Sequence, residues 1–188
     1  AGIFDLPQSR NCGTGSTEVS CDCQDPNNDN PLCEPNPNDL DANGNPLGSV
    51  IPVATSSLDE YDARVACNGA GDFVVTYTRN TTSTNQDILA KRYNASSTLL
   101  GTLYVATNPA LSERASDVAR TTAGADRFTI AYQVGFDISA KRYAGTGTLL
   151  GTSAVATGAN SQKLPSVDID DAGDSVPLHA LHADAADE

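Results

Sequence analysis

Two segments of the sequence are nearly identical. DILAKRYNASSTLLGTLYVAT occupies residues 87–107, and DISAKRYAGTGTLLGTSAVAT occupies residues 137–157. The full units are longer, at about 63–107 and 116–157, and they begin with ARVACNGAGDFVVTYTRN and SDVARTTAGADRFTIAYQ. A repeat with a period near 50 residues indicates structural units that are stacked in a row or arranged in a circle.

Incomplete copies of the unit flank the two complete ones. LDANGNPLGSVIPVAT at residues 40–55 matches the end of a unit, and PSVDIDDAGDSVPLH at residues 165–179 matches the beginning of a third. The chain therefore divides into a segment rich in Cys, Asn and Pro (1–38), a β-repeat region (39–160), and a partial third repeat with an acidic tail (161–188).

Each unit contains four runs typical of β-strands, separated by turn-forming residues. In the first unit these runs are Arg64–Cys67, Asp72–Thr78, Ile88–Tyr93 and Leu99–Ala106. Larger residues alternate with smaller ones in the second run of both units, and they are Phe73, Val75, Tyr77, Phe128, Ile130 and Tyr132. A four-stranded sheet of this size cannot bury both of its faces alone, so we expect it to stack on a copy of itself.

The predicted fold is all-β, with antiparallel four-stranded units stacked as β-propeller-like blades. A β-sandwich and an open solenoid are the alternatives. Roughly three units are fewer than a closed propeller needs, so two chains complete a ring, the stack stays open, or the sequence belongs to a longer array. In the third copy, Pro177 stands where Val75 and Ile130 stand in the others. Because proline cannot donate to a β-ladder, this strand should be an edge strand or end early.

The motifs LDANGNPLG, AGDFVVTY, DILAKRYN, DISAKRY and PSVDIDDAGD carry a resemblance. The unit resembles the repeats of large secreted and surface proteins of bacteria, which have the approximate pattern RYDANGNPLG…VNT…PSVAMDADGDFVVVW…DIYAQRYD. The similarity covers residues 40–176, and Tyr77 and Tyr132 stand where the family usually has Trp. The resemblance implies a propeller-like fold and an adhesive or structural role.

The charge of the chain restricts its partners. The formal net charge is −13, with 11 Lys and Arg residues against 24 Asp and Glu residues. Such a chain repels the phosphates of nucleic acids and of anionic lipids, and no apolar run is long enough to insert into a membrane. Ala1, without an initiator Met, fits a chain from which a signal peptide has been removed. We expect a secreted protein, extracellular or on the cell surface.

Four of the five cysteines are clustered near the beginning of the sequence, and these are Cys12, Cys21, Cys23 and Cys33. In a secreted chain such density predicts disulfides, with two bridges and one cysteine left over, although the pairing is open. A zinc site is less favoured because CDC lacks the spacing of a CxxC motif. Cys67 could pair with this segment, pair with another chain, or remain a buried apolar residue.

Two acidic segments are candidates for calcium binding, because oxygen ligands at alternate positions can converge on a hard cation. In DLDANGN the candidate ligands are Asp39, Asp41 and Asn43, but Val50 occupies the twelfth position, where an EF-hand has Glu. A hairpin turn explains the same residues equally directly. The second segment, DIDDAGD, supplies Asp168, Asp170, Asp171 and Asp174. Calcium is the one cofactor that the sequence suggests.

Other polar motifs have a functional and a structural interpretation. His179 and His182, with Asp184, could bind a transition metal if the segment were helical, or they belong to a frayed terminus. Asn80 and Asn94 begin N-glycosylation sequons, each expected in a surface loop.

The two KRY motifs place Lys91 and Lys141 at equivalent positions of the repeats. We expect these cations to pair with Asp87 and Asp137 or to line the edge of a unit. A ligand site made by them is a further alternative.

No catalytic motif is present: GxSxG, HExxH, P-loop and dinucleotide-binding fingerprints are all missing from the sequence. The sequence therefore favours a secreted, non-enzymatic structural or surface protein. We expect it to assemble with copies of itself or to mediate adhesion, for example as the subunit of an extracellular filament or sheath. The alternative is a carbohydrate- or calcium-binding module of a larger extracellular protein, with glycans as partners.

Overall fold

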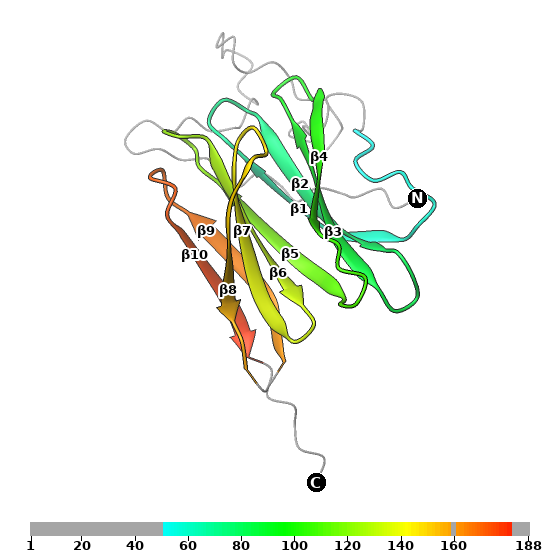
Figure 1. Cartoon of the computed structure of the whole chain (residues 1–188). Helices are drawn as coiled ribbons and strands as arrows, with labels where there is room; N and C mark the ends of the chain where they lie inside the picture. The colour runs from blue at the N-terminus through cyan, green and yellow to red at the C-terminus, as the bar shows by residue number, and fades with distance from the viewer. Residues whose placement is uncertain (1–50, 159–160, 182–188) are drawn as a thin grey trace, which may run out of the picture.

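The computed structural model describes residues 51–158 and 161–181, and all structural statements concern these residues. They form ten β-strands and no helix. The strands make three antiparallel sheets, of four, four and two strands, that succeed one another along the chain and lie side by side (Figure 1). The prediction of an all-β protein with four-stranded antiparallel units is confirmed. No helix of the described residues is long and apolar enough to cross a membrane.

In each sheet, neighbours in sequence are neighbours in space. The first sheet contains β1 (Glu60–Cys67), β2 (Phe73–Asn80), β3 (Gln86–Tyr93) and β4 (Leu99–Ala106). The second contains β5 (Glu113–Arg120), β6 (Arg127–Val134), β7 (Asp137–Ala144) and β8 (Leu149–Ala156). The third contains β9 (Gln162–Ile169) and β10 (Ser175–Leu181).

The two near-identical segments fold alike. Phe73 begins β2 and pairs with Tyr93 on β3, and Phe128 on β6 pairs in the same way with Tyr143 on β7. The rings of both pairs are stacked, with centroids 4.9 Å and 5.1 Å apart. The repeated sequence therefore specifies a repeated sheet, as the alternation of large and small residues predicts.

The first strand of each sheet carries an irregularity that the sequence pattern does not predict. Asp62, Ala115 and Leu164 occupy the same position on β1, β5 and β9, and their φ angles are 52°, 51° and 54°. The pairing register shifts at this position in the first two sheets. The predicted strand from Arg64 is consequently too short, because β1 begins four residues earlier, at Glu60. A residue with positive φ interrupts the two-residue alternation on which the prediction depends.

Each four-stranded sheet has two different faces. We call the side that carries Phe73, Val75 and Tyr77, and their counterparts Phe128, Ile130 and Tyr132, the aromatic face. The aromatic face of the second sheet packs against the opposite face of the first, where Val74, Ile88 and Val105 are completely buried. β5 lies against β1, β2 and β3, so the sheets meet through their first strands. The contact between these two sheets is therefore directional, with an aromatic face placed on a non-aromatic one.

The two remaining aromatic-face contacts differ in size. The aromatic face of the first sheet is covered by residues 51–54, of which Val53 and Ala54 are buried against it. The third sheet packs on the second through the smaller side chains of Ala119, Ala131 and Val167. Because β9 and β10 are only two strands, they cover only part of the second sheet.

Pro177 pairs with Val167 on β9, and β10 has no second neighbour within the described residues. The prediction that proline makes this an edge strand is confirmed. None of the three sheets closes on itself.

Candidate functional site

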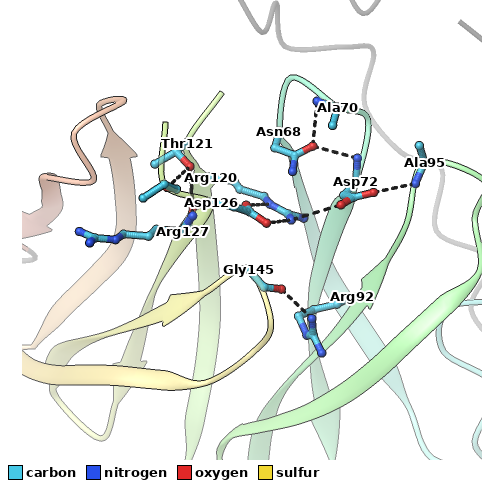
Figure 2. A network of polar contacts seen from close by, with 11 residues as sticks. Asn68, Ala70, Asp72, Arg92, Ala95, Arg120, Thr121, Asp126, Arg127 and Gly145 are labelled. Carbon is cyan, nitrogen blue, oxygen red and sulfur yellow. Dashed lines mark hydrogen bonds and ion pairs between the residues drawn. The ribbon is translucent and has the colours of Figure 1, made fainter. Parts of the chain in front are cut away.

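The most extensive polar structure of the molecule lies where the turns of adjacent sheets meet (Figure 2). At its centre Arg120, the last residue of β5, donates from Nε and Nη2 to both carboxylate oxygens of Asp126, each at 2.8 Å. The same Nη2 lies 4.0 Å from a carboxylate oxygen of Asp72 in the first sheet. The Arg120 side chain is only 2% exposed. A buried guanidinium needs such partners, so Arg120 ties the second sheet to the first.

Hydrogen bonds to backbone atoms complete this network. The Asn68 side-chain oxygen accepts from the amides of Ala70 (3.0 Å) and Asp72 (2.9 Å), which fixes the β1–β2 turn. On the far side, Arg92 Nη1 donates to the carbonyl of Gly145 at 2.6 Å. Figure 2 shows this contact reaching from β3 to the β7–β8 turn of the second sheet. Burial and the positive charge of Arg120 lower the pKa of Arg92.

The β1–β2, β5–β6 and β9–β10 turns are hydrogen-bonded in series. The Gly69 amide donates to the Thr122 carbonyl at 2.9 Å. One turn further on, Asp171 Oδ1 accepts from the Thr122 amide (3.1 Å), the Thr122 hydroxyl (2.7 Å) and the Ala123 amide (3.0 Å). These bonds lower the pKa of Asp171, and the bond from the Thr122 hydroxyl has the largest effect. Gly124 permits the approach, because a Cβ there would lie 2.8 Å from the Asp171 carbonyl oxygen.

The lysines of the two KRY motifs join sheets rather than pairing with aspartates. Lys141 Nζ donates to the Val105 carbonyl on β4, and Lys91 Nζ donates to the Val53 carbonyl. The expected pairing with Asp87 and Asp137 is not formed, and Asp87 instead lies 3.8 Å from Arg79. The segment around Val53 therefore packs on the first sheet in the same way as β4 packs on the second sheet.

A second cluster of ionisable groups is buried between the first two sheets. Glu113, at the beginning of β5, is 2% exposed and accepts a hydrogen bond from the Asn108 amide at 3.2 Å, but its Oε2 has no partner. Burial raises the pKa of Glu113, and the neighbouring charge of Asp87 adds to the effect. Burial likewise raises the pKa of Asp87, against the opposing charge of Arg79. Two carboxyls with raised pKa values resemble an acid–base pair.

Neither of two hollows in the described part of the chain adjoins this pair. Acid–base catalysis needs a substrate within hydrogen-bond reach. One hollow, of about 240 Å³, lies between the second and third sheets and is lined by Arg142 and Leu150. Another, of about 260 Å³, lies beside Asn80 and Asp59. Neither Glu113 nor Asp87 lines either of them.

The acidic segment proposed for calcium forms a turn. Asp170 Oδ1 accepts from the Asp174 amide at 2.9 Å, Asp168 Oδ1 accepts from the Ile169 amide at 2.9 Å, and Asp171 bonds the neighbouring sheet. No group of three or more metal-ligating side chains occurs in the described part of the chain. Asp39, Asp41 and Asn43 lie outside the described residues. Calcium binding by either segment stays a prediction.

The two predicted glycosylation sites have different surroundings. Asn94 lies in the β3–β4 turn, where a loop was expected, and its side chain accepts from the Thr98 amide at 2.8 Å. For Asn80 the loop prediction is wrong, because it is the half-buried last residue of β2 and accepts a hydrogen bond from the Tyr61 hydroxyl at 3.1 Å. Glycosylation of either residue stays a prediction.

The cysteine and histidine predictions fall mainly outside the described residues, which exclude Cys12, Cys21, Cys23, Cys33, His182 and Asp184. Cys67 ends β1, half-buried at the margin of the cluster on the aromatic face. The backbone of His179 belongs to β10, so the helix on which a His179–His182 metal site depends is not formed there.

Sequence reasoning missed three functional contacts, made by Arg120, by Glu113 and by the two lysines. The available signal was the segment Ala-Lys-Arg-Tyr, which is identical in both repeats. A scan against protein-family models and a search among curated proteins match nothing to this chain.

Proposed function

We propose that this chain is a non-enzymatic structural repeat protein, whose sheets are propeller-like blades and which assembles with further copies of itself. The observation that carries the proposal is the repetition of one set of contacts from sheet to sheet. The contact of a lysine with a backbone carbonyl is made at two successive positions, and the turns of all three sheets are hydrogen-bonded in series. Such a mode of packing has no built-in last member, since each added sheet offers the next one the same surface.

The blade interpretation is supported by the way in which the sheets meet. β9 lies against β5, β6 and β7, just as β5 lies against β1, β2 and β3. The first strand of each later sheet thus lies against the first three strands of the sheet before it, an arrangement that the stacked blades of a propeller would also have. The resemblance to repeats of bacterial secreted and surface proteins supports an extracellular location and an adhesive or structural role, for example in a filament or sheath. The net charge of −13 fits a soluble surface without nucleic-acid partners.

The mass of the protein in solution tests the proposal. Sedimentation and light scattering should show species larger than one chain, growing with protein concentration, and electron microscopy of negatively stained samples should show rings or filaments. Measurements with and without calcium would include the predicted effect of a cation on the acidic segments. A chain that stays monomeric at high concentration under both conditions would refute self-assembly.

A further inference from the structure

The two ends of the described stack are complementary to each other. Three positions of the first strand face the preceding sheet. On β5 these are Ser116, Val118 and Arg120, and all three are buried beneath the first sheet, at 3%, 4% and 6% exposure. The same positions on β1 are Ala63, Val65 and Cys67, and all three are only half-buried. The first sheet therefore has, along β1, a contact surface that is partly open.

The third sheet offers the matching surface at the other end. Val74 is the residue of β2 on which the second sheet rests, and it is 0% exposed. Its counterpart in the second sheet, Thr129, is 1% exposed beneath the third. Val176 occupies this position on β10 and is 62% exposed. The third sheet therefore exposes an apolar side chain at a position that, in both other repeats, is covered by the next sheet.

Residues 51–54 already occupy part of the layer that precedes the first sheet. Lys91 holds the Val53 carbonyl as Lys141 holds the Val105 carbonyl on β4. Val53 and Ala54 thus stand in the place of the last strand of a preceding sheet. The first strands of such a preceding sheet would lie beside residues 51–54 and against β1, where the half-buried surface is found. β9 and β10 are first and second strands, and they lack a third and a fourth partner within the described residues.

We infer that the third sheet of one copy binds along β1 of a second copy, so that residues 51–54 of the second copy lie in the same sheet layer as β9 and β10. The inference rests on the proposed function and specifies its interface. Because the two surfaces are different, the contact is head to tail. Contacts of this kind produce a ring if the rotation per copy closes and a filament if it does not.

Three substitutions on the third sheet test the interface. Val176→Asp places a charge at its centre and should weaken association roughly tenfold or more, since burial of an apolar side chain is replaced by burial of a carboxylate. Asp168 is exposed where the other repeats have Ala66 and Ala119, which pack between sheets. Asp168→Ala should therefore strengthen association.

The matched control for these changes is Leu164→Asp. Leu164 is 71% exposed in the same sheet, but its counterpart on β1 is the exposed Asp62, so the position lies outside the contact. This control should associate like the unchanged protein. All three sites are exposed, and circular dichroism would verify that each variant is folded.

Mixing two defective variants distinguishes a head-to-tail contact from a symmetric one. Ala63→Glu damages the β1 surface and leaves the third sheet intact, whereas Val176→Asp does the opposite. At a concentration where the unchanged protein assembles and each variant alone does not, an equimolar mixture should form dimers that do not grow further. If Ala63→Glu fails to fold, the three substitutions on the third sheet decide the question by themselves.

The outcomes separate this inference from the proposed function. Assembly that Val176→Asp leaves unchanged, or that Leu164→Asp weakens equally, would overturn the interface but not self-assembly. A mixture that stays monomeric would overturn the head-to-tail arrangement. An unchanged protein that is monomeric at every concentration would overturn both.

Discussion

Replacing Glu113 by glutamine should stabilise the protein at neutral pH. The carboxyl is 2% exposed, one of its oxygens accepts a hydrogen bond from Asn108, and the other has no partner. Glutamine retains an oxygen for Asn108 and removes the buried charge. The third sheet already has this residue, because Gln162 begins β9 at the equivalent position and is 4% exposed.

The size and sign of the effect depend on burial and on the pKa. The polar atom at the Oε2 position stays unpaired in the variant, so the gain comes from removing the buried charge. The attraction of Lys141 offsets part of the cost of that charge, which leaves a gain of about 1 kcal/mol. Burial raises the pKa of Glu113 above its ordinary value of 4.5. The stability contributed by the protonated carboxyl is therefore complete below pH 4.5 and is lost as the pH rises through the raised value. The variant avoids that loss.

Thermal unfolding measured by circular dichroism at pH 4 and pH 7.5 gives both the size of the effect and its dependence on pH. The Glu113→Gln variant should have a Tm about 4 °C higher at pH 7.5, with a smaller difference at pH 4. Glu60→Gln is the matched control, because Glu60 begins β1 and its two oxygens bond the amide and hydroxyl of Ser56. An amide can bond both groups, so no change is expected. A Glu113 variant that is destabilised at pH 7.5 but not at pH 4 would show that the charge is required and would refute the reasoning.

Three further substitutions test the contacts between sheets. Arg120→Ala removes the partner of the Asp126 carboxylate and should cost about 1–2 kcal/mol at pH 7 in chemical denaturation, less than for a fully buried pair because the Asp126 side chain is 39% exposed. Burial raises the pKa of Asp126, but the Arg120 hydrogen bonds and charge lower it further, so this contribution exists above pH 3.8 and is lost as the pH falls through the lowered pKa. The cost should therefore shrink in acid. Gly124→Ala, at a φ of 73° and with its Cβ 2.8 Å from the Asp171 carbonyl oxygen, should accelerate amide hydrogen exchange in β9 and β10 before it affects the first sheet. Lys141→Met removes the hydrogen bond to the β4 carbonyl and should cost about 1 kcal/mol, whereas an unchanged unfolding midpoint would show that this contact contributes nothing.

The parts of the fold that could be predicted are those in which local pattern and tertiary environment agree. β2 and β6 alternate large and small residues and are buried on both faces, β6 between two sheets and β2 between the second sheet and residues 51–54. Period and burial therefore give the same answer. The segment around Asp170 predicts either a turn or a calcium site, because the same short polar residues suit both. In the structure the Asp170 carboxylate bonds a backbone amide of its own turn.

The parts that could not be predicted depend on the relation between sheets. Lys91 and Lys141 have aspartates nearby in sequence, but the closest acceptors in space are carbonyls 38 and 36 residues away. The residues equivalent to Arg120 in the other two sheets are Cys67 and Ile169, which are apolar. The repeat pattern therefore did not indicate a buried charge at this position. Its partner Asp126 comes only six residues later in the sequence, but Arg120 also approaches Asp72, which belongs to another sheet.

The difference between the two faces explains how a repeat of one sequence can produce an assembly with a direction. If both faces were alike, a sheet could be placed on its neighbour in either orientation, and repeats would pair two by two. Here Phe128 and Tyr132 must meet the residues around Val74, and Arg92 must reach the turn at Gly145, so only one order of sheets satisfies both contacts. In the proposed self-assembly, growth would occur at two chemically different ends, and the angle between sheets rather than the contacts themselves would set its limit.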